Sequence, residues 1–208
     1  MNYLVLSFVK IWRAINLLYY YRALPWLNRK RLIVCKVELG KNVNIQAHCH
    51  LRIDKTAEVT IGNNVTITGA PLSNPLNTHS PIICVCPGAT LKIGNGCGLS
   101  SPVIWCSNRI TIKDGAGIGG NVLIMDSDAH SLDYRDRSDS IVDKANTKSA
   151  EICIGENSLI GANSIILKGV CIGAHSIIGA GSVVTKDIPA DCIAGGNPCK
   201  VIKYMYNI

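Results

Sequence analysis

One histidine stands among acidic residues in a polar stretch of the chain, residues 125–151. His130 is close in sequence to Asp126, Asp128 and Asp133. An imidazole, with a pKa of about 6.5, can take up or release a proton near neutral pH, and a carboxylate can hold its tautomer or stabilise its cation. The group therefore has the chemistry for proton transfer. The structural alternative is a solvated loop histidine surrounded by acids.

Two other groups of residues have side chains that bind metals. They are His48-Cys49-His50 and Cys84-Val85-Cys86. Neither has a second ligand pair at zinc-finger spacing. His79 lies in a stretch rich in proline and glycine, where a solvated loop histidine is the simpler interpretation. We therefore expect no metal site.

A strict six-residue repeat is the clearest structural signal, and it runs from Ile154 to Pro189. Along the repeat, an aliphatic residue is followed four positions later by a small residue, which is usually serine. An amphipathic helix repeats every three or four residues and a strand every two, so a period of six fits neither element alone. The aliphatic positions are Ile154, Ile160, Ile166, Ile172, Ile178 and Val184. The small positions are Ser158, Ser164, Val170, Ser176 and Ser182.

The repeat predicts a solenoid in which each six residues form a short strand and a corner. Three sides would close one triangular coil of eighteen residues, with the aliphatic residue pointing inward. Glycine follows it at Gly155, Gly161, Gly173 and Gly179, where we expect it to turn the corner without steric cost. Successive coils would stack at about 4.8 Å, the spacing of paired strands.

Composition agrees with a narrow aliphatic interior. The 208 residues are 48% hydrophobic but only 5% aromatic. The ten cysteines stay below the density of a disulfide-stapled scaffold, and Cys49 and Cys97 take small corner positions. We interpret most of them as buried thiols of a protein in a reducing cytoplasm.

The N-terminal segment, residues 1–36, differs from the rest and predicts an amphipathic helix that ends at Pro25. Residues 1–41 carry eight basic side chains against Glu38, which accounts for the net charge of +7. Two interpretations stay open and are compatible. The helix caps the open end of the solenoid, or it lies at a membrane surface with Trp12 and Trp26 at headgroup depth.

Two interruptions divide the repeat region, residues 37–190, and a tail of residues 191–208 follows it. The first interruption, residues 69–88, contains four prolines and two glycines. The second, residues 125–150, is polar and contains His130. A rigid solenoid tolerates such insertions, and loops on a rigid frame are common places for chemistry.

With the repeat, the segment IGGNVLIMDSDAHSLDYRDR and the tail IGAGSVVTKDIPADCIAGGNPCKVIK, the sequence resembles the hexapeptide-repeat acyltransferases, in particular the maltose and galactoside O-acetyltransferases and the surface-polysaccharide O-acetyltransferases. The resemblance covers about residues 90–203 and implies a left-handed parallel β-helix that assembles as a homotrimer. It also implies that His130 is the catalytic base, and we expect Asp128 to support it because Asp128 is near in sequence. Ser100, Asn121 and Asp126 are the candidates near the acceptor or the oxyanion.

The same resemblance implies acetyl-CoA as co-substrate, bound in a groove between coils of adjacent subunits. The chain has lysine where the family often has arginine, and Leu159 where it often has tryptophan. Small residues let the extended pantetheine approach the backbone, and lysines meet phosphate as compact charges. The implied cofactor-binding residues are Ala162, Ala180, Thr185, Lys186, Lys200 and Lys203.

The resulting hypothesis is a cytoplasmic acetyl-CoA-dependent O-acetyltransferase acting on a sugar hydroxyl of a cell-surface polysaccharide or its precursor. It would contact the inner face of the membrane through its N-terminus and bind no nucleic acid. Three alternatives stay open. They are acetylation of a xenobiotic or amino-sugar amine, a γ-type carbonic anhydrase-like metalloenzyme, and a scaffold without catalysis.

Overall fold

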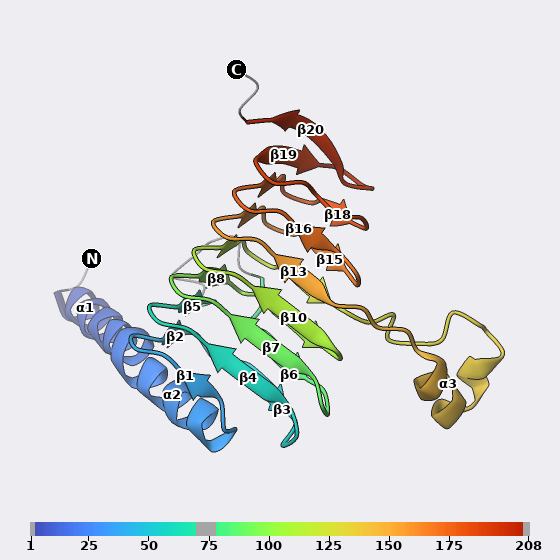
Figure 1. Cartoon of the computed structure of the whole chain (residues 1–208). Coiled ribbons are helices and arrows are strands. Elements are labelled where there is room, and N and C mark those ends of the chain that lie inside the picture. Colours follow the sequence, from blue (N-terminus) through green and yellow to red (C-terminus); the bar gives the residue numbers. More distant parts are fainter. Residues whose placement is uncertain (1–2, 70–77, 206–208) are drawn as a thin grey trace.

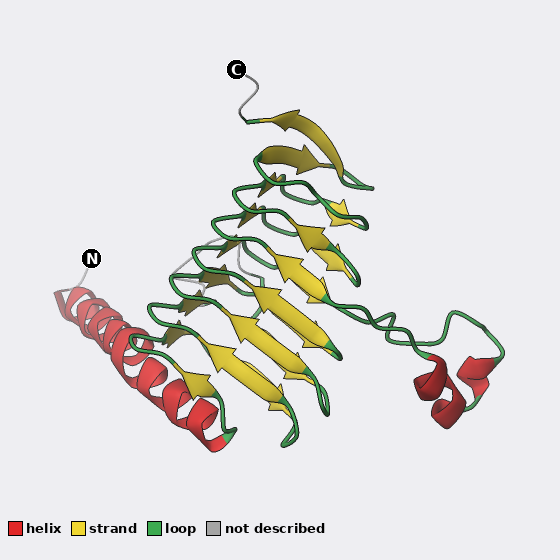
Figure 2. Ribbon diagram, viewed as in Figure 1, coloured by secondary structure: helices red, strands yellow, loops and turns green. Residues whose placement is uncertain are grey.

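The computed structural model describes residues 3–69 and 78–205, and its main body is a triangular prism of stacked coils. Three sheets, parallel except for the last strand β20 (Lys200–Tyr204), form the three sides of the prism (Figures 1 and 2). The first sheet contains β1 (Glu38–Leu39), β4 (Glu58–Ile61), β7 (Thr90–Ile93), β10 (Arg109–Ile112), β13 (Ile152–Ile154) and β16 (Cys171–Ile172). The second contains β2 (Asn44–Gln46), β5 (Thr66–Thr68), β8 (Gly98–Ser100), β11 (Gly117–Ile118), β14 (Leu159–Ile160), β17 (Ile177–Ile178), β19 (Cys192–Gly195) and β20 (Lys200–Tyr204). The third contains β3 (His50–Ile53), β6 (Ile82–Val85), β9 (Val103–Cys106), β12 (Leu123–Met125), β15 (Ile165–Leu167) and β18 (Val183–Val184).

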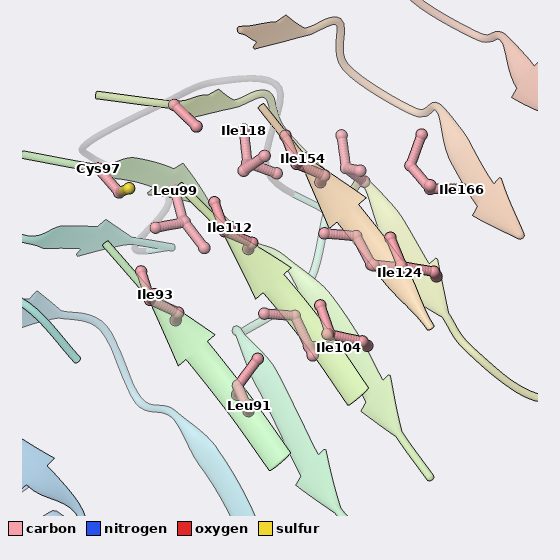
Figure 3. Close-up of a cluster of buried hydrophobic side chains, with 14 of the residues drawn as sticks. Leu91, Ile93, Cys97, Leu99, Ile104, Ile112, Ile118, Ile124, Ile154 and Ile166 are labelled. Carbon is pink, nitrogen blue, oxygen red and sulfur yellow. The ribbon is translucent and has the colours of Figure 1, made fainter. Parts of the chain in front are cut away.

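The register of the strands confirms the period of the coil. Ile154 pairs with Ile172, Ile160 with Ile178, and Ile166 with Val184. Every aliphatic position of the repeat is at most 1% exposed, as are its small positions. Figure 3 shows the same inward stacking lower in the prism, where Ile112, Ile118 and Ile124 come from the three sides of one coil.

The glycines that follow the aliphatic residues have a different role from the predicted one. Gly155 and Gly161 have no left-handed φ, so they do not turn the corner. They lack a side chain because the next coil occupies its place: a Cβ on Gly155 would lie 2.5 Å from the Ala174 nitrogen. The corner itself is turned two residues later by a residue with positive φ, such as Asn157 or Asn163. At the corner between the first and second sheets these residues are Asn42, Asn64, Gly96, Gly115, Asn157, His175 and Asp191.

The N-terminal segment is one continuous helical rod that continues past Pro25. It comprises α1 (Tyr3–Leu18), a π-helical segment (Tyr19–Ala23) and α2 (Leu24–Val34). Pro25 is the second residue of α2, and Ala23 and Leu24 before it keep helical φ and ψ angles, so the rod continues through the proline and the predicted stop was wrong. The buried Asn28 donates from Nδ2 to the carbonyl oxygens of Ile45 (3.1 Å) and Ala47 (2.7 Å). The rod therefore closes the open end of the first coil.

Both predicted interruptions are shorter or more structured than the sequence suggested. Residues 69–88 include β6, which pairs in parallel with β3 and β9, and residues 70–77 lie outside the described part of the chain. The second interruption leaves the prism at the corner between the third and first sheets and contains a helix, α3 (Ser140–Asn146) (Figure 1). The predicted tail also contains β19 and β20, which form an antiparallel pair over the last coil.

All ten cysteines are free thiols. Five are buried, and burial raises the pKa of Cys49 to about 12. Cys171 is exposed, and the remaining four are half-buried. The buried thiols therefore behave as small apolar side chains of the interior.

Glycines that lie against the next coil and glycines with open space beside them should respond in opposite ways to an added methyl group. Gly155→Ala forces its Cβ against the backbone of the next coil and should destabilise the protein by about 1–3 kcal/mol. Gly98 has ordinary φ and open space around the same position, so Gly98→Ala should be neutral or slightly stabilising. Thermal unfolding of both variants tests this, and equal unfolding temperatures would contradict the close-approach role.

Candidate active site

The polar insertion, residues 126–151, forms an arm that projects from the prism. Its two ends are joined by the backbone hydrogen bond from Ala150 N–H to the Asp126 oxygen (2.9 Å). A bridge between Ser127 and Ser149 lies next to it. Beyond them the chain forms a short 3₁₀ turn (Asp136–Ser138) and α3, whose N-cap Asp139 accepts from Ile141 N–H at 2.8 Å. The arm is therefore a folded element held at one edge of the coil.

His130 lies on the arm and contacts Asp143 of α3. The His130 Nδ1 to Asp143 Oδ2 distance is 2.7 Å, and Ser131 N–H donates to the other carboxylate oxygen at 2.7 Å. Arg137 donates to the Ser131 carbonyl oxygen at 2.9 Å and fixes this turn. The imidazole is thereby held in one orientation although 68% of the side chain is exposed.

The contact with Asp143 sets the protonation pattern of the ring. The hydrogen bond from His130, followed by that from the Ser131 N–H, holds the pKa of Asp143 below its ordinary value. An ionised carboxylate only accepts hydrogen bonds, so Nδ1 carries the hydrogen of the neutral ring. Nε2 then carries the lone pair and has no hydrogen-bond partner among the described residues. This is the arrangement of a general base with a supporting acid.

The acids that were expected around His130 have other roles. Asp128 forms an ion pair with Lys168 (3.2 Å), so the prediction that it supports His130 is wrong. Asp126 is fully buried and accepts from the N–H groups of Ser107 (2.6 Å) and Asn108 (2.8 Å), so it cannot contact an acceptor. Asp133 forms an ion pair with Arg135.

Asp143 was missed because it is thirteen residues from His130 in sequence, in a stretch taken for an irregular loop. Only α3 brings the two side chains together. The signal that was available is the helix start at Asp139-Ser140, where an aspartate stands at an N-cap position before Ile141 and Val142.

A cavity of about 760 Å³ lies between the arm and the outer face of the third sheet. Arg52, Cys84 and Trp105 are neighbours in register across β3, β6 and β9 and form its floor. Asp143 and Lys144 of the arm line the opposite side. Trp105 is 40% exposed, so an apolar surface with Arg52 and Lys144 around it lies beside Asp143.

Ser100 and Asn121 lie at a different edge of the prism, the corner between the second and third sheets. Ser100 Oγ is 3.0 Å from Thr68 Oγ1, and Asn121 takes the left-handed corner conformation with φ of 59°. Asn121 precedes β12 and Asp126 follows it. The five residue steps from Asn121 to Asp126, at which the arm begins, span roughly 16 Å when extended. One chain therefore does not bring Ser100 or Asn121 to His130.

The residues expected to bind the cofactor also divide between edges. Ala162 and Ala180 stack at the corner between the second and third sheets, where Gly181 N–H donates to the Ala162 oxygen at 2.8 Å. Lys200 starts β20 at the same corner, paired with Gly195, and Lys203 lies further along that strand. Thr185 and Lys186 are exposed beyond the other end of β18.

No group of three or more His, Cys, Asp or Glu side chains within residues 3–69 and 78–205 is placed to hold a metal ion. The pairs His48 and His50, and Cys84 and Cys86, gain no third ligand from the fold.

The repeat matches a known family of proteins, and parts of the chain match individual relatives. Residues 154–186 match the family model "Bacterial transferase hexapeptide (six repeats)". Two proteins of Staphylococcus aureus match part of the chain: the protein named CapG is 69% identical over 52 residues, and a 2,3,4,5-tetrahydropyridine-2,6-dicarboxylate N-acetyltransferase is 47% identical over 55 residues. These matches cover 25% and 26% of this chain, and 30% and 23% of the relatives. The chain thus matches less than a third of the length of these relatives.

Solved structures extend the likeness to the whole fold. A hexapeptide-repeat acetyltransferase of Vibrio cholerae, complexed with acetyl coenzyme A, is 25% identical, with a TM-score of 0.59 over 93% of this chain and 85% of that one. A maltose O-acetyltransferase of Clostridium difficile is 23% identical, with a TM-score of 0.55 over 99% and 90%. An N-acyltransferase of Bacillus cereus, in complex with dTDP and coenzyme A, is 22% identical, with a TM-score of 0.63 over 82% and 84%. The left-handed parallel β-helix and the resemblance to hexapeptide-repeat acyltransferases are thereby confirmed.

The hydrogen bond to Asp143 predicts the tautomer of the neutral His130 ring. We expect nitrogen NMR shifts to show hydrogen on Nδ1, and we expect Asp143→Ala to release this preference. His175, whose Nδ1 lies 3.0 Å from Asp191, provides the matched control because Asp143→Ala leaves its contact unchanged. A His130 ring with hydrogen on Nε2 in the unmodified protein would contradict the arrangement.

Proposed function

We propose that this chain is an acetyl-CoA-dependent O-acetyltransferase that acts on a sugar hydroxyl, with His130 as its general base. The observation that carries the proposal is the His130–Asp143 pair: Nδ1 contacts the carboxylate, the imidazole is largely exposed, and Asp143 itself lines the cavity. The likeness to a hexapeptide-repeat acetyltransferase in complex with acetyl coenzyme A supports the type of reaction and the co-substrate.

The reaction follows from the chemistry of these groups. His130 Nε2 takes the proton of the acceptor hydroxyl while its oxygen attacks the thioester carbonyl of acetyl-CoA. A C–O bond forms, the C–S bond breaks, and the CoA sulfur leaves with the proton returned by the imidazolium. Asp143 is ionised beside the ring and stabilises the cation between these two transfers. The thioester is already activated, so no metal is required by this scheme.

The donor would lie along the corner that contains Ala162, Ala180 and Lys200. The small side chains there leave the backbone accessible to the amide groups of pantetheine. Lys200 and Lys203 are exposed and would face the phosphates of CoA, with Thr185 and Lys186 beyond the end of β18. These assignments come from the family resemblance, and the described geometry supports them most directly for Ala162, Ala180 and Lys200.

We propose that the complete site forms between chains of a homotrimer. Within one chain the donor corner and His130 lie at different edges of the prism, separated by the width of the third sheet. Packing one prism edge against another would bring the base of one chain to the donor corner of its neighbour, together with Ser100 and Asn121. Light scattering should then give a mass of three times 22.3 kDa, and a monomer that is active would contradict this arrangement.

The acceptor would enter the cavity beside the arm, and its class is a sugar of a cell-surface polysaccharide or its precursor. Trp105 offers an apolar face for the C–H side of a sugar ring, while Arg52 and Lys144 can bind its hydroxyl or anionic groups. A protein working on such precursors with acetyl-CoA would act in the cytoplasm.

An amine acceptor is the second candidate function. The relative from Staphylococcus aureus is named as an N-acetyltransferase, and a structural neighbour is an N-acyltransferase in complex with dTDP. The same base could take a proton from an ammonium or an attacking amine, so an amino sugar fits the chemistry. An acceptor screen that compares sugars with amino sugars and aminoglycoside-like compounds separates the two functions.

Replacing the base tests the reaction itself. His130→Ala should reduce CoA release with the best acceptor by about 10²- to 10⁴-fold, because proton transfer then falls to water. Calorimetry should show unchanged CoA binding, and light scattering an unchanged assembly. His175→Asn is the control, since His175 is also an exposed histidine paired with an aspartate and asparagine tolerates its left-handed backbone. Unchanged turnover in His130→Ala would end the assignment of the base.

Replacing Trp105 tests the acceptor site. Trp105→Ala should raise the KM for the acceptor by roughly three- to tenfold through loss of ring stacking, and leave the KM for acetyl-CoA unchanged. Trp12→Ala, at an exposed tryptophan of α1, serves as the control. An increase in the KM for acetyl-CoA alone would assign the cavity to the donor.

A further inference from the structure

The N-terminal rod has one covered part and one uncovered part. Leu24, Asn28 and Leu32 of α2 are buried against the first coil. From Phe8 to Leu18 of α1 the large apolar side chains are exposed, with Phe8 at 71% and Leu18 at 64%. Capping therefore explains α2 but leaves the apolar side of α1 without a role.

Five of the exposed apolar residues of α1 form one stripe, whereas Val9 and Leu17 are exposed outside it. Phe8, Ile11, Trp12, Ile15 and Leu18 follow one another at three- and four-residue spacing, which places them on one side of a helix. Lys10 and Arg13 lie off this stripe, toward the other side. We call the stripe, together with the outward side of α2, the N-terminal face.

The outward side of α2 combines aromatic and basic groups. Trp26 is 61% exposed, and Ile33 is exposed on the same side about two turns later. Arg29 and Lys30 lie beside them. Lys30 Nζ is 5.8 Å from the centroid of the Trp26 ring. Aromatic rings with neighbouring long basic chains suit the boundary between lipid headgroups and acyl chains, where the charge can reach the water side.

The charge of the segment indicates what covers the N-terminal face. Residues 1–37 contain no Asp or Glu, while Lys10, Arg13, Arg22, Arg29 and Lys30 project from the rod. A second copy of the rod would bring cations against cations. A negatively charged lipid surface would attract these cations. At ordinary salt concentration the attraction extends over about 10 Å.

The rod is suited to lie on a bilayer and not to cross one. No helix in the described part of the chain is long and apolar enough to cross a membrane. A stripe on one side of the helix, with cations beside it, matches a helix that lies in the plane of the interface.

We propose that the N-terminal face docks on an anionic phospholipid surface, with Trp12 and Trp26 at headgroup depth. This inference goes beyond acetyl transfer and does not depend on it. Docking would turn the first coil toward the lipid and hold the prism at the surface where membrane-bound glycan precursors occur.

The test measures binding of the full chain to vesicles by co-sedimentation. We expect binding to vesicles of phosphatidylcholine mixed with phosphatidylglycerol, weaker binding to phosphatidylcholine alone, and loss of the difference at about 1 M salt. Arg29→Gln/Lys30→Gln should reduce the partition coefficient roughly 25-fold, because each basic group near an anionic surface contributes about fivefold. Lys55→Gln/Lys113→Gln removes the same charge from exposed positions elsewhere and should change binding less than twofold.

The apolar stripe has its own matched pair of variants. Ile11→Ser/Ile15→Ser should weaken vesicle binding, whereas Leu132→Ser/Ile141→Ser, at even more exposed residues of the arm, should not. In a Trp105→Phe background the fluorescence of Trp12 and Trp26 should shift to shorter wavelength when the mixed vesicles are added.

Three results would overturn the proposal. The first is no binding of the unmodified chain to mixed vesicles, and the second is equal loss of binding in a variant and its control. The third is a change of oligomeric state by Ile11→Ser/Ile15→Ser without a change in vesicle binding, which would assign the face to a second copy. His130→Ala should leave vesicle binding intact, and the α1 variants should leave acetylation of a soluble acceptor intact, so failure of either proposal is recognised separately.

Discussion

The structure depends on the close approach of one coil to the next. Parallel strands pair at about 4.8 Å, so at every corner the backbone of one coil lies against that of its neighbour. Gly155 and Gly161 leave no room for a Cβ, with the next coil's nitrogen at 2.5 and 2.4 Å from its position. The residues with left-handed φ then turn the chain onto the next side. These local requirements, together with one inward aliphatic residue per side, explain the six-residue period.

The same constraint explains why much of the fold was predictable from the sequence. Aliphatic residues at Ile160 and Ile178 predicted the inward column and the eighteen-residue coil, and the register confirms both. The role of the glycines was mistaken, because sequence alone does not distinguish a residue that turns the chain from one that a neighbouring backbone approaches. The helical rod was predicted to stop at Pro25, but a proline is only a probable helix boundary, and here the π-helical segment runs through into α2.

The candidate site was predicted less completely, because its contacts do not follow the repeat. His130 was identified from its segment, but Asp143 contacts it only through the fold of the arm. Asp128 and Asp126 are nearer in sequence and face other partners, namely Lys168 and the backbone of the Ser107 turn. Side-chain direction in an irregular segment depends on long-range contacts, so proximity in sequence was a poor guide.

The arm joins the prism without disturbing the pairing of the strands on either side of it. Ile110 pairs with Ile152 in unbroken register, although the whole arm lies between them in the chain. The backbone bond from Ala150 to Asp126 closes the base of the arm, and the buried Asp126 carboxylate belongs to the coil beneath it. The segment between these two residues can therefore change in length and sequence while the strand pairing of the coil stays the same, and the ion pair between Asp128 and Lys168 is the contact that such a change would have to replace.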